Sequence, residues 1–192
     1  MVVFLIGLAI FLGIHLVPTM PGTREALLRR FGENGYKGLF SVLSFVGLVL
    51  LVWGFGLARQ SPANVQLWAP PVWTKHIAFA LMPFAFILLA AAYIPSRIRD
   101  HAKHPMLAAI KLWAFAHLLA NGDLAGVLLF GAFLAWGVYD RISVKKRGAL
   151  GPLGRARGGL GGDIAAIVVG LVVYAAMLLR GHTLLIGVPL IG

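Results

Sequence analysis

Six long apolar runs recur along this chain of 192 residues, and they constrain its fold more than any other feature. A helix that crosses a membrane needs about 20 apolar residues, with about 17 as the lower limit. The second and third runs reach this length, whereas the other four reach it only when flanking residues are counted. The runs are Val2–Leu16, Gly38–Ala58, Ile77–Ile94, Met106–Ala120, Leu124–Tyr139 and Ile164–Leu179.

The runs predict an all-α fold, a polytopic membrane helix bundle of about six transmembrane helices in a single domain, residues 1–192. Only α-helices and closed β-barrels pair all their backbone groups in lipid, and these runs are too long and uniformly apolar for barrel strands. Composition agrees, because 60% of the residues are hydrophobic and only 12% are charged. With flanking residues, the expected spans are 2–17, 38–58, 76–94, 105–120, 122–139 and 163–180.

The net charge of +11 indicates membrane topology rather than nucleic-acid binding, because the basic residues lie in loops. When the loops are assigned alternately to two faces, one face carries 13 Lys and Arg residues and the other carries 3. The positive-inside rule places the richer face in the cytoplasm, so both termini are expected on the non-cytoplasmic side. An odd number of spans would remove this bias. The richer face has Arg24, Arg29, Arg30, Lys37, Arg97, Arg99, Lys103, Arg141, Lys145, Lys146, Arg147, Arg155 and Arg157.

The segments between the runs carry few recognisable motifs. The absence of cysteine excludes disulfides, thiolate metal sites and thiol catalysis. Residues 24–31 are expected to form either a short basic amphipathic helix, stopped by Gly32 and Gly35, or an ordinary solvated connector. The Gly148–Gly162 segment is expected to be a flexible loop, and Asp163 to cap the last helix. Gly122 and Gly126 form a G-x-x-x-G step of the kind that packs membrane helices closely.

The stretch His104–Asp123 combines membrane-compatible length with ionisable side chains. Such groups are costly at membrane depth, so we interpret them as functional groups with a partner elsewhere. Asn121 lies four residues after His117, on the same helical face, and is expected to orient the imidazole or a bound ligand. Lys111 lies on a different face and is expected to meet Asp123 or an acidic group of a cofactor.

Only two of the six histidines, His15 and His117, lie well within apolar runs. Their depths in the membrane differ by roughly 9 Å when each helical residue rises about 1.5 Å, a difference that helix tilt absorbs. Two imidazoles from facing helices are a natural site for haem iron in a bundle core. The alternative is that each imidazole bonds a backbone carbonyl or hydroxyl across the bundle. Small or aromatic walls for the flat macrocycle are expected from Gly7, Gly13, Trp113 and Phe115.

The other four histidines are assigned no role in the site. His101 and His104 have a spacing that metal sites use, but no further ligand lies beside them, so solvated loop histidines are the simpler interpretation. His76 is expected to face water, and His182 precedes a C-terminal tail that is too short to span the membrane.

Two long segments resemble the NnrU family of bacterial membrane proteins. They are HLVPTMPGTREALLRRFGENGYKGLFSVLSF and HPMLAAIKLWAFAHLLANGDLAGVLLFGAFLAWGVYDR, and the resemblance extends over nearly the whole chain. It implies a multi-pass protein of the bacterial inner membrane that is linked to denitrification and nitrogen-oxide metabolism.

The family is also similar to plastid cis-ζ-carotene isomerase, a haem b membrane enzyme. The shared parts are a histidine at the end of the first shared helix and a His-Pro…Ala-His segment, which match His15 and the stretch from His104 to His117. This resemblance implies that His15 and His117 are the axial ligands of haem b.

Three functions are therefore expected from the sequence. The first is a haem b protein that acts in nitrogen-oxide metabolism or as a redox-type isomerase on a small apolar substrate. The second is a non-enzymatic accessory factor that associates with components of nitrite or nitric oxide reductases. The third, a small-molecule transporter, is disfavoured by the few buried polar groups. In each case the chain contacts the lipid bilayer and no nucleic acid.

Overall fold

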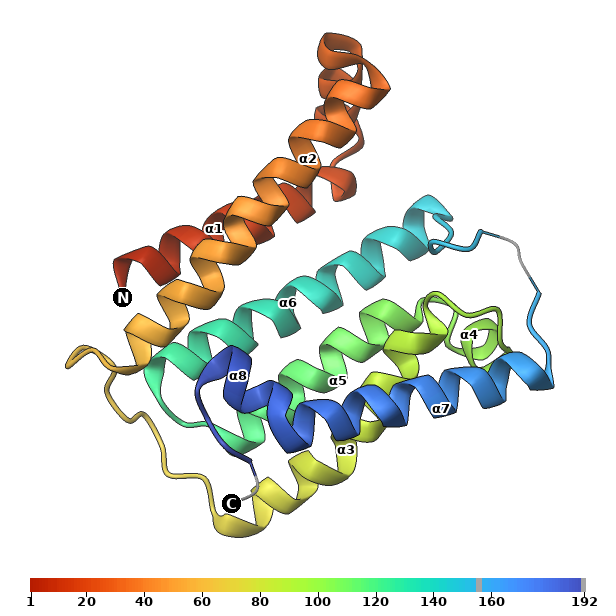
Figure 1. Ribbon diagram of the computed structural model, residues 1–192. Helices are drawn as coiled ribbons and strands as arrows, with labels where there is room; N and C mark the ends of the chain where they lie inside the picture. The colour runs from red at the N-terminus through yellow and green to blue at the C-terminus, as the bar shows by residue number, and fades with distance from the viewer. Residues whose placement is uncertain (155–156, 191–192) are drawn as a thin grey trace. The chain divides into compact units, whose positions relative to one another are not determined.

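The computed structural model describes residues 1–154 and 157–190, and the described chain is helical with no strand, only two isolated bridges (Figure 1). This confirms the predicted fold class. The chain divides into two compact units, Met1–Val65 and Gln66–Gly192, each with its own packed interior. Arg155, one of the basic residues assigned to the cytoplasmic face, lies outside the described residues.

Five helical segments of the described chain are long and apolar enough to cross a membrane, so the chain is a multi-pass membrane protein. The remaining predicted span, 105–120, coincides with α5 (Pro105–Ala120), an apolar helix of 16 residues that is shorter than the other five. The five long segments are Val2–Thr19, Pro21–Arg59, Val72–Ala91, Leu124–Arg147 and Leu160–Ile186.

The first unit is a hairpin in which α1 (Val2–Leu16) packs against α2 (Pro21–Arg59). A short 3-10 turn, η1 (Val17–Thr19), joins the two helices where Pro18 follows the end of α1. The predicted span 38–58 lies in the part of α2 that follows Gly32. This helical part begins before residue 38.

Glycines set the close approach of α1 and α2. A Cβ placed on Gly47 would lie 2.8 Å from the backbone nitrogen of Phe11, and Gly7 and Gly54 are covered as tightly by the backbone of the opposite helix. Small residues at such positions allow membrane helices to gain packing contacts along their length. Gly7 was expected to line a cofactor site. Because it packs against the backbone of α2 instead, that expectation is wrong.

A kink at Gly32 divides α2 into two helical parts. Gly32 has φ 68° and ψ 174°, in a region that favours glycine. The predicted break at Gly32 is thus confirmed, and so is a helix over residues 24–31, whereas Gly35 lies inside the second part and stops nothing. The guanidinium of Arg24 lies 5.9 Å from the centre of the Tyr36 ring, so a side chain before the kink contacts one after it.

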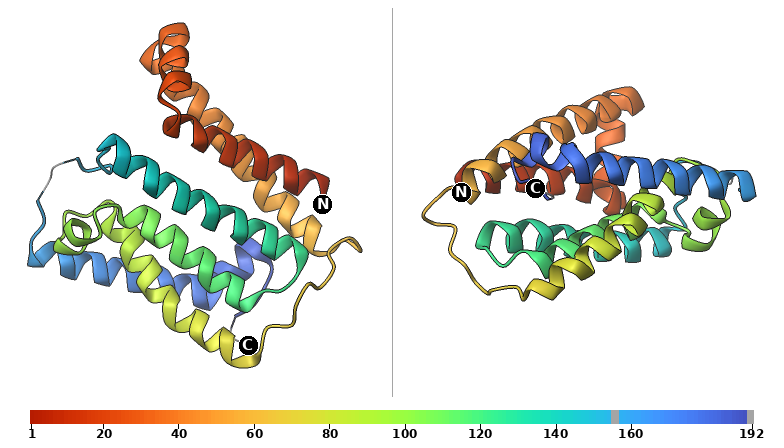
Figure 2. Two further views of the ribbon diagram at one scale, coloured as in Figure 1. Left: turned by 180° about the vertical axis from the view of Figure 1, so that it is seen from behind. Right: turned by 60° about the horizontal axis from the view of Figure 1, so that its bottom comes forward.

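The second unit is built around α3 (Val72–Ala91), which packs against both α5 and α7 (Leu160–Ala176), while α6 (Leu124–Arg147) packs against α5 (Figure 2). After α7 the chain forms a π-helical segment, η2 (Met177–Gly181), and the short α8 (His182–Ile186). Alanines dominate the buried positions of α3 and α5, which keeps these apolar helices close.

Three predicted boundaries in the second unit are wrong. α6 continues beyond residue 139 to Arg147. The loop predicted after the third span contains α4 (Arg97–Ala102), because the hydroxyl of Ser96 caps it by accepting the backbone N–H of Arg99 at 3.2 Å. α7 begins at Leu160 with Gly159 as its cap, so Asp163 lies within the first turn instead of at the cap.

Asp163 instead joins α7 to α4. One carboxylate oxygen accepts a hydrogen bond from Nε of Arg97 at 2.6 Å, and the other accepts the backbone N–H of Ile98 at 3.1 Å. Such charge-assisted bonds are stronger than neutral ones. They fix the start of α7 to the short helix that precedes α5.

The glycine-rich segment before α7 is also tied to α4. Nη2 of Arg99 donates to the carbonyl oxygen of Gly154 at 2.5 Å, and a carboxylate oxygen of Asp100 accepts the backbone N–H of Gly158 at 3.2 Å. Both sides of the loop that was predicted to be flexible are therefore anchored.

The glycine contacts of the hairpin predict that Gly54→Ala lowers the melting temperature of the detergent-solubilised protein. The new Cβ would meet the backbone of Phe4 in α1, and overpacking of this kind costs about 1–3 kcal/mol. The matched control is Gly56→Ala, because nothing lies within 4 Å of a Cβ at that position. Equal melting temperatures for the two variants, measured by a thermal unfolding scan, would contradict the glycine-mediated contact.

Candidate functional site

His15 lies near the end of α1 among aromatic rings of the first unit. Its ring centre is 4.3 Å from that of Phe11 and 5.2 Å from that of Phe40. Its Nδ1 lies 2.6 Å from the carbonyl oxygen of Phe11. Because a carbonyl only accepts, Nδ1 carries the hydrogen, and Nε2 of the neutral imidazole carries the lone pair that binds metals.

His117 lies in the last turn of α5, in an aromatic cluster of the second unit. Its Nδ1 is 2.9 Å from the carbonyl oxygen of Trp113, which again assigns the lone pair to Nε2. The His117 ring centre is 4.5 Å from that of Phe130 on α6 and 5.2 Å from that of Trp113. Trp113 also makes edge contacts with Phe130 at 5.1 Å and with Phe133 at 5.4 Å.

The two histidines thus share one local arrangement. Each donates Nδ1–H to the carbonyl four residues earlier in its own helix, whereas the alternative interpretation expected a carbonyl or hydroxyl partner across the bundle. Histidine ligands commonly donate their second nitrogen in this way, which fixes the tautomer and the ring orientation. His101 makes the same bond to Arg97 at 2.7 Å, yet it is exposed on α4. An apolar aromatic environment is therefore what sets His15 and His117 apart.

Asn121 ends α5 and contacts His117 through the backbone. Its backbone N–H and its side-chain Nδ2 both donate to the carbonyl oxygen of His117, at 2.9 and 2.8 Å. Asn121 was predicted to orient the imidazole of His117. In the structure its side chain stabilises the last turn of α5, the helix that carries His117.

The corner after Asn121 is fixed by the segment that precedes α3. The carbonyl oxygen of Gly122 accepts the backbone N–H groups of Leu67 at 2.8 Å and Trp68 at 3.2 Å. A side chain on Gly122 would collide with the carbonyl of Trp68. Gly122 thus lies outside the helices and in contact with a loop, so the predicted G-x-x-x-G helix contact with Gly126 is wrong.

Lys111 does not reach Asp123. Its stem packs over Gly137 of α6, where an added Cβ would lie 2.9 Å from Cγ of Lys111. Gly137 is about 21 Å along the helix from Asp123 at 1.5 Å per residue. Asp123 instead caps α6 by accepting the backbone N–H of Gly126 at 3.2 Å.

Two other predicted wall residues face away from helix contacts. Phe115 is 47% exposed, and a Cβ placed on Gly13 would meet nothing within 4 Å. Trp113 is the predicted wall residue that the structure places against an imidazole.

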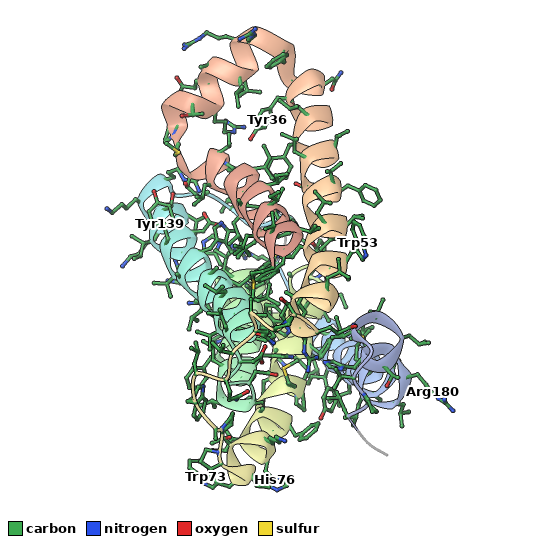
Figure 3. All side chains as sticks on the ribbon, turned by 90° about the vertical axis from the view of Figure 1, so that its left-hand side faces the viewer. Tyr36, Trp53, Trp73, His76, Tyr139 and Arg180 are labelled. Carbon is green, nitrogen blue, oxygen red and sulfur yellow. The ribbon has the colours of Figure 1, made fainter. Side chains whose placement is uncertain are left out.

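The remaining histidines of the described chain have separate roles. Figure 3 shows His76 beside Trp73 at the N-terminal end of α3, where both are exposed. His104 is the N-cap residue of α5. Its burial lowers the pKa of the imidazole, the nearby Arg141 lowers it further, and Asp140 opposes these effects. His182 begins α8 with Nδ1 2.8 Å from the carbonyl oxygen of Val188.

Among the described residues, no group of three or more His, Asp or Glu side chains is placed to hold a metal ion. A bare ion therefore lacks a protein ligand set in this part of the chain. A haem brings its own ring of nitrogen ligands and requires only axial ones from the protein, so its demands fit single imidazoles in apolar surroundings.

The sequence missed the rings that enclose the two imidazoles. Phe11 lies four residues before His15, and helical spacing alone would have found it. Phe40 and Phe130 come from other helices, so only the packing of α1 on α2 and of α5 on α6 identifies them.

Comparison with known proteins gives one match. The family model described as NnrU protein matches residues 3–190, nearly the whole chain. No curated protein and no solved structure matches the chain.

The cap on α5 predicts that Asn121→Ala destabilises the protein, because the variant loses the side-chain donor to the His117 carbonyl. A hydrogen bond of this type contributes about 0.5–1.5 kcal/mol, which a shift in melting temperature measures. Asn64→Ala is the matched control, since its Nδ2 donates to the carbonyl of Arg59 at 3.4 Å in an exposed loop. A larger effect of Asn64→Ala than of Asn121→Ala would contradict the importance of the cap.

Proposed function

Because this chain belongs to the NnrU family, we propose that it is a haem b-binding protein of the bacterial inner membrane, with His15 and His117 as axial ligands. The proposal includes six membrane spans, with α5 as the shortest, and both termini on the non-cytoplasmic side. A span of 16 residues is accommodated by local thinning of the bilayer or by its flanking residues.

One observation carries the proposal. Both histidines that lie within apolar helices have Nδ1 engaged by a backbone carbonyl, which leaves the metal-binding lone pair on Nε2. Both also lie against aromatic rings, which suit the faces and edges of a macrocycle. His15 belongs to the first unit and His117 to the second.

When bound, the haem would supply an iron centre that changes oxidation state, or that coordinates a small ligand once one of the two imidazoles has left the iron. The chain's own residues determine the surroundings of the two imidazoles. Phe40 and Phe130 place aromatic rings against the imidazoles, and Asn121 holds the turn that carries His117. We propose that this centre acts in nitrogen-oxide metabolism or in redox-type isomerase chemistry on a small apolar substrate.

The proposal predicts a Soret band and stoichiometric haem b in protein purified after expression with haem supply. His15→Ala and His117→Ala should each change the band by removing one axial ligand, and the double variant should lose the haem. His101→Ala is the matched control, because its Nδ1 makes the same carbonyl bond at an exposed site.

Absorption spectra and haem extraction provide the measurement. A purified protein without a Soret band would contradict the proposal, and so would a band that persists unchanged in the double variant. Stable co-purification with a reductase in the absence of any haem would favour an accessory role instead.

A further inference from the structure

An apolar pocket of about 230 Å³ lies between α3 and α5, within the second unit. Its wall includes Ala85, Phe86 and Leu89 from α3, and Ala109, Ile110 and Trp113 from α5. None of the lining side chains is charged, so burying a charged or strongly polar group there would leave that group unpaired and costly.

The sequence explains both the space and its entrance. Ala85 and Ala109 are almost fully buried, at 4% and 3% exposure, and their small side chains leave room between helices that are otherwise in contact. Leu89 is 40% exposed, so the pocket reaches the surface of α3. Since α3 is long and apolar enough to cross a membrane, we expect this opening to face lipid.

We infer that this pocket binds an uncharged hydrocarbon group of a small apolar molecule that enters from the bilayer. An apolar cavity of about 150 Å³ holds benzene, so the space between α3 and α5 admits a longer chain or a larger ring. The inference rests on the proposed function, because it names the class of substrate, and it places that substrate beside the helix that carries His117.

Trp113 connects the pocket to the candidate haem ligand. Its indole lines the pocket, its ring lies 5.2 Å from the His117 ring, and its carbonyl oxygen accepts Nδ1–H of His117. A molecule in the pocket therefore touches the residue that orients the imidazole.

The test uses an octyl diazirine as the photoreactive probe and the full-length chain in lipid nanodiscs. Crosslinks mapped by mass spectrometry are expected within residues 82–89 and 106–113, and an excess of unlabelled octane should abolish them. Leu89→Phe, which fills the pocket from its exposed rim, should remove the competable labelling. Ile110→Phe provides a second filled variant from α5, in case one substitution disturbs folding.

The matched control is Phe84→Leu, which alters a 60% exposed residue of α3 outside the pocket wall and should keep the competable labelling. Labelling that octane does not compete would indicate ordinary contact with lipid chains and would overturn the inference. Equal competable labelling in the filled variants would also overturn it. The crosslinking test does not depend on haem. A missing Soret band would therefore refute the proposed function, while the crosslinking would still show whether the pocket binds octane. With haem bound, octane should shift the Soret band of the wild type and not of Leu89→Phe.

Discussion

The absence of water inside a bilayer is the constraint on which this structure depends. Every backbone N–H and C=O group in the apolar segments must be paired within the chain, and the described residues meet this requirement with helices. Hydrophobic burial does not bring such helices together, so close packing does. In the first unit glycines at the α1–α2 contact provide it, and in the second unit alanines on α3 and α5 do so.

The same constraint determines the chemistry of the two intramembrane histidines. A polar ring in apolar surroundings needs a hydrogen-bond partner, and each imidazole finds one in the carbonyl at the preceding turn of its own helix. That bond fixes the tautomer, so the structural requirement for pairing also produces a ligand lone pair on Nε2. Aromatic residues then keep the surroundings apolar. The tautomer of each imidazole is therefore set by the backbone of its own helix.

The features that the sequence predicted well are those set by local chemistry. Pro105 and the apolar run that follows it predict α5 with its observed bounds, because proline is favoured in the first turn of a helix. Gly32 predicts the break in α2, because glycine adopts a positive φ without steric cost. The apolar runs that contain His15 and His117 likewise predict the apolar surroundings of their imidazoles.

The features that the sequence missed depend on contacts between distant segments. Asp163 resembles a helix cap, yet its carboxylate binds Arg97 and the backbone of α4. Asn121 shares a helical face with His117, but its amide is used by the backbone at the end of α5. Helical periodicity predicts which face of a helix a residue occupies. It does not predict which donor or acceptor the side chain will bind.

The claim that His15 and His117 bind the same haem is tested most directly by a distance between their helices. Because the chain has no cysteine, single cysteines at Gly13 and Phe115 allow selective spin labelling and double electron–electron resonance. The account predicts one narrow distance when haem is bound, which broadens when both histidines are replaced by alanine. A distance distribution that is the same with and without haem, and the same in the histidine variant, would contradict it.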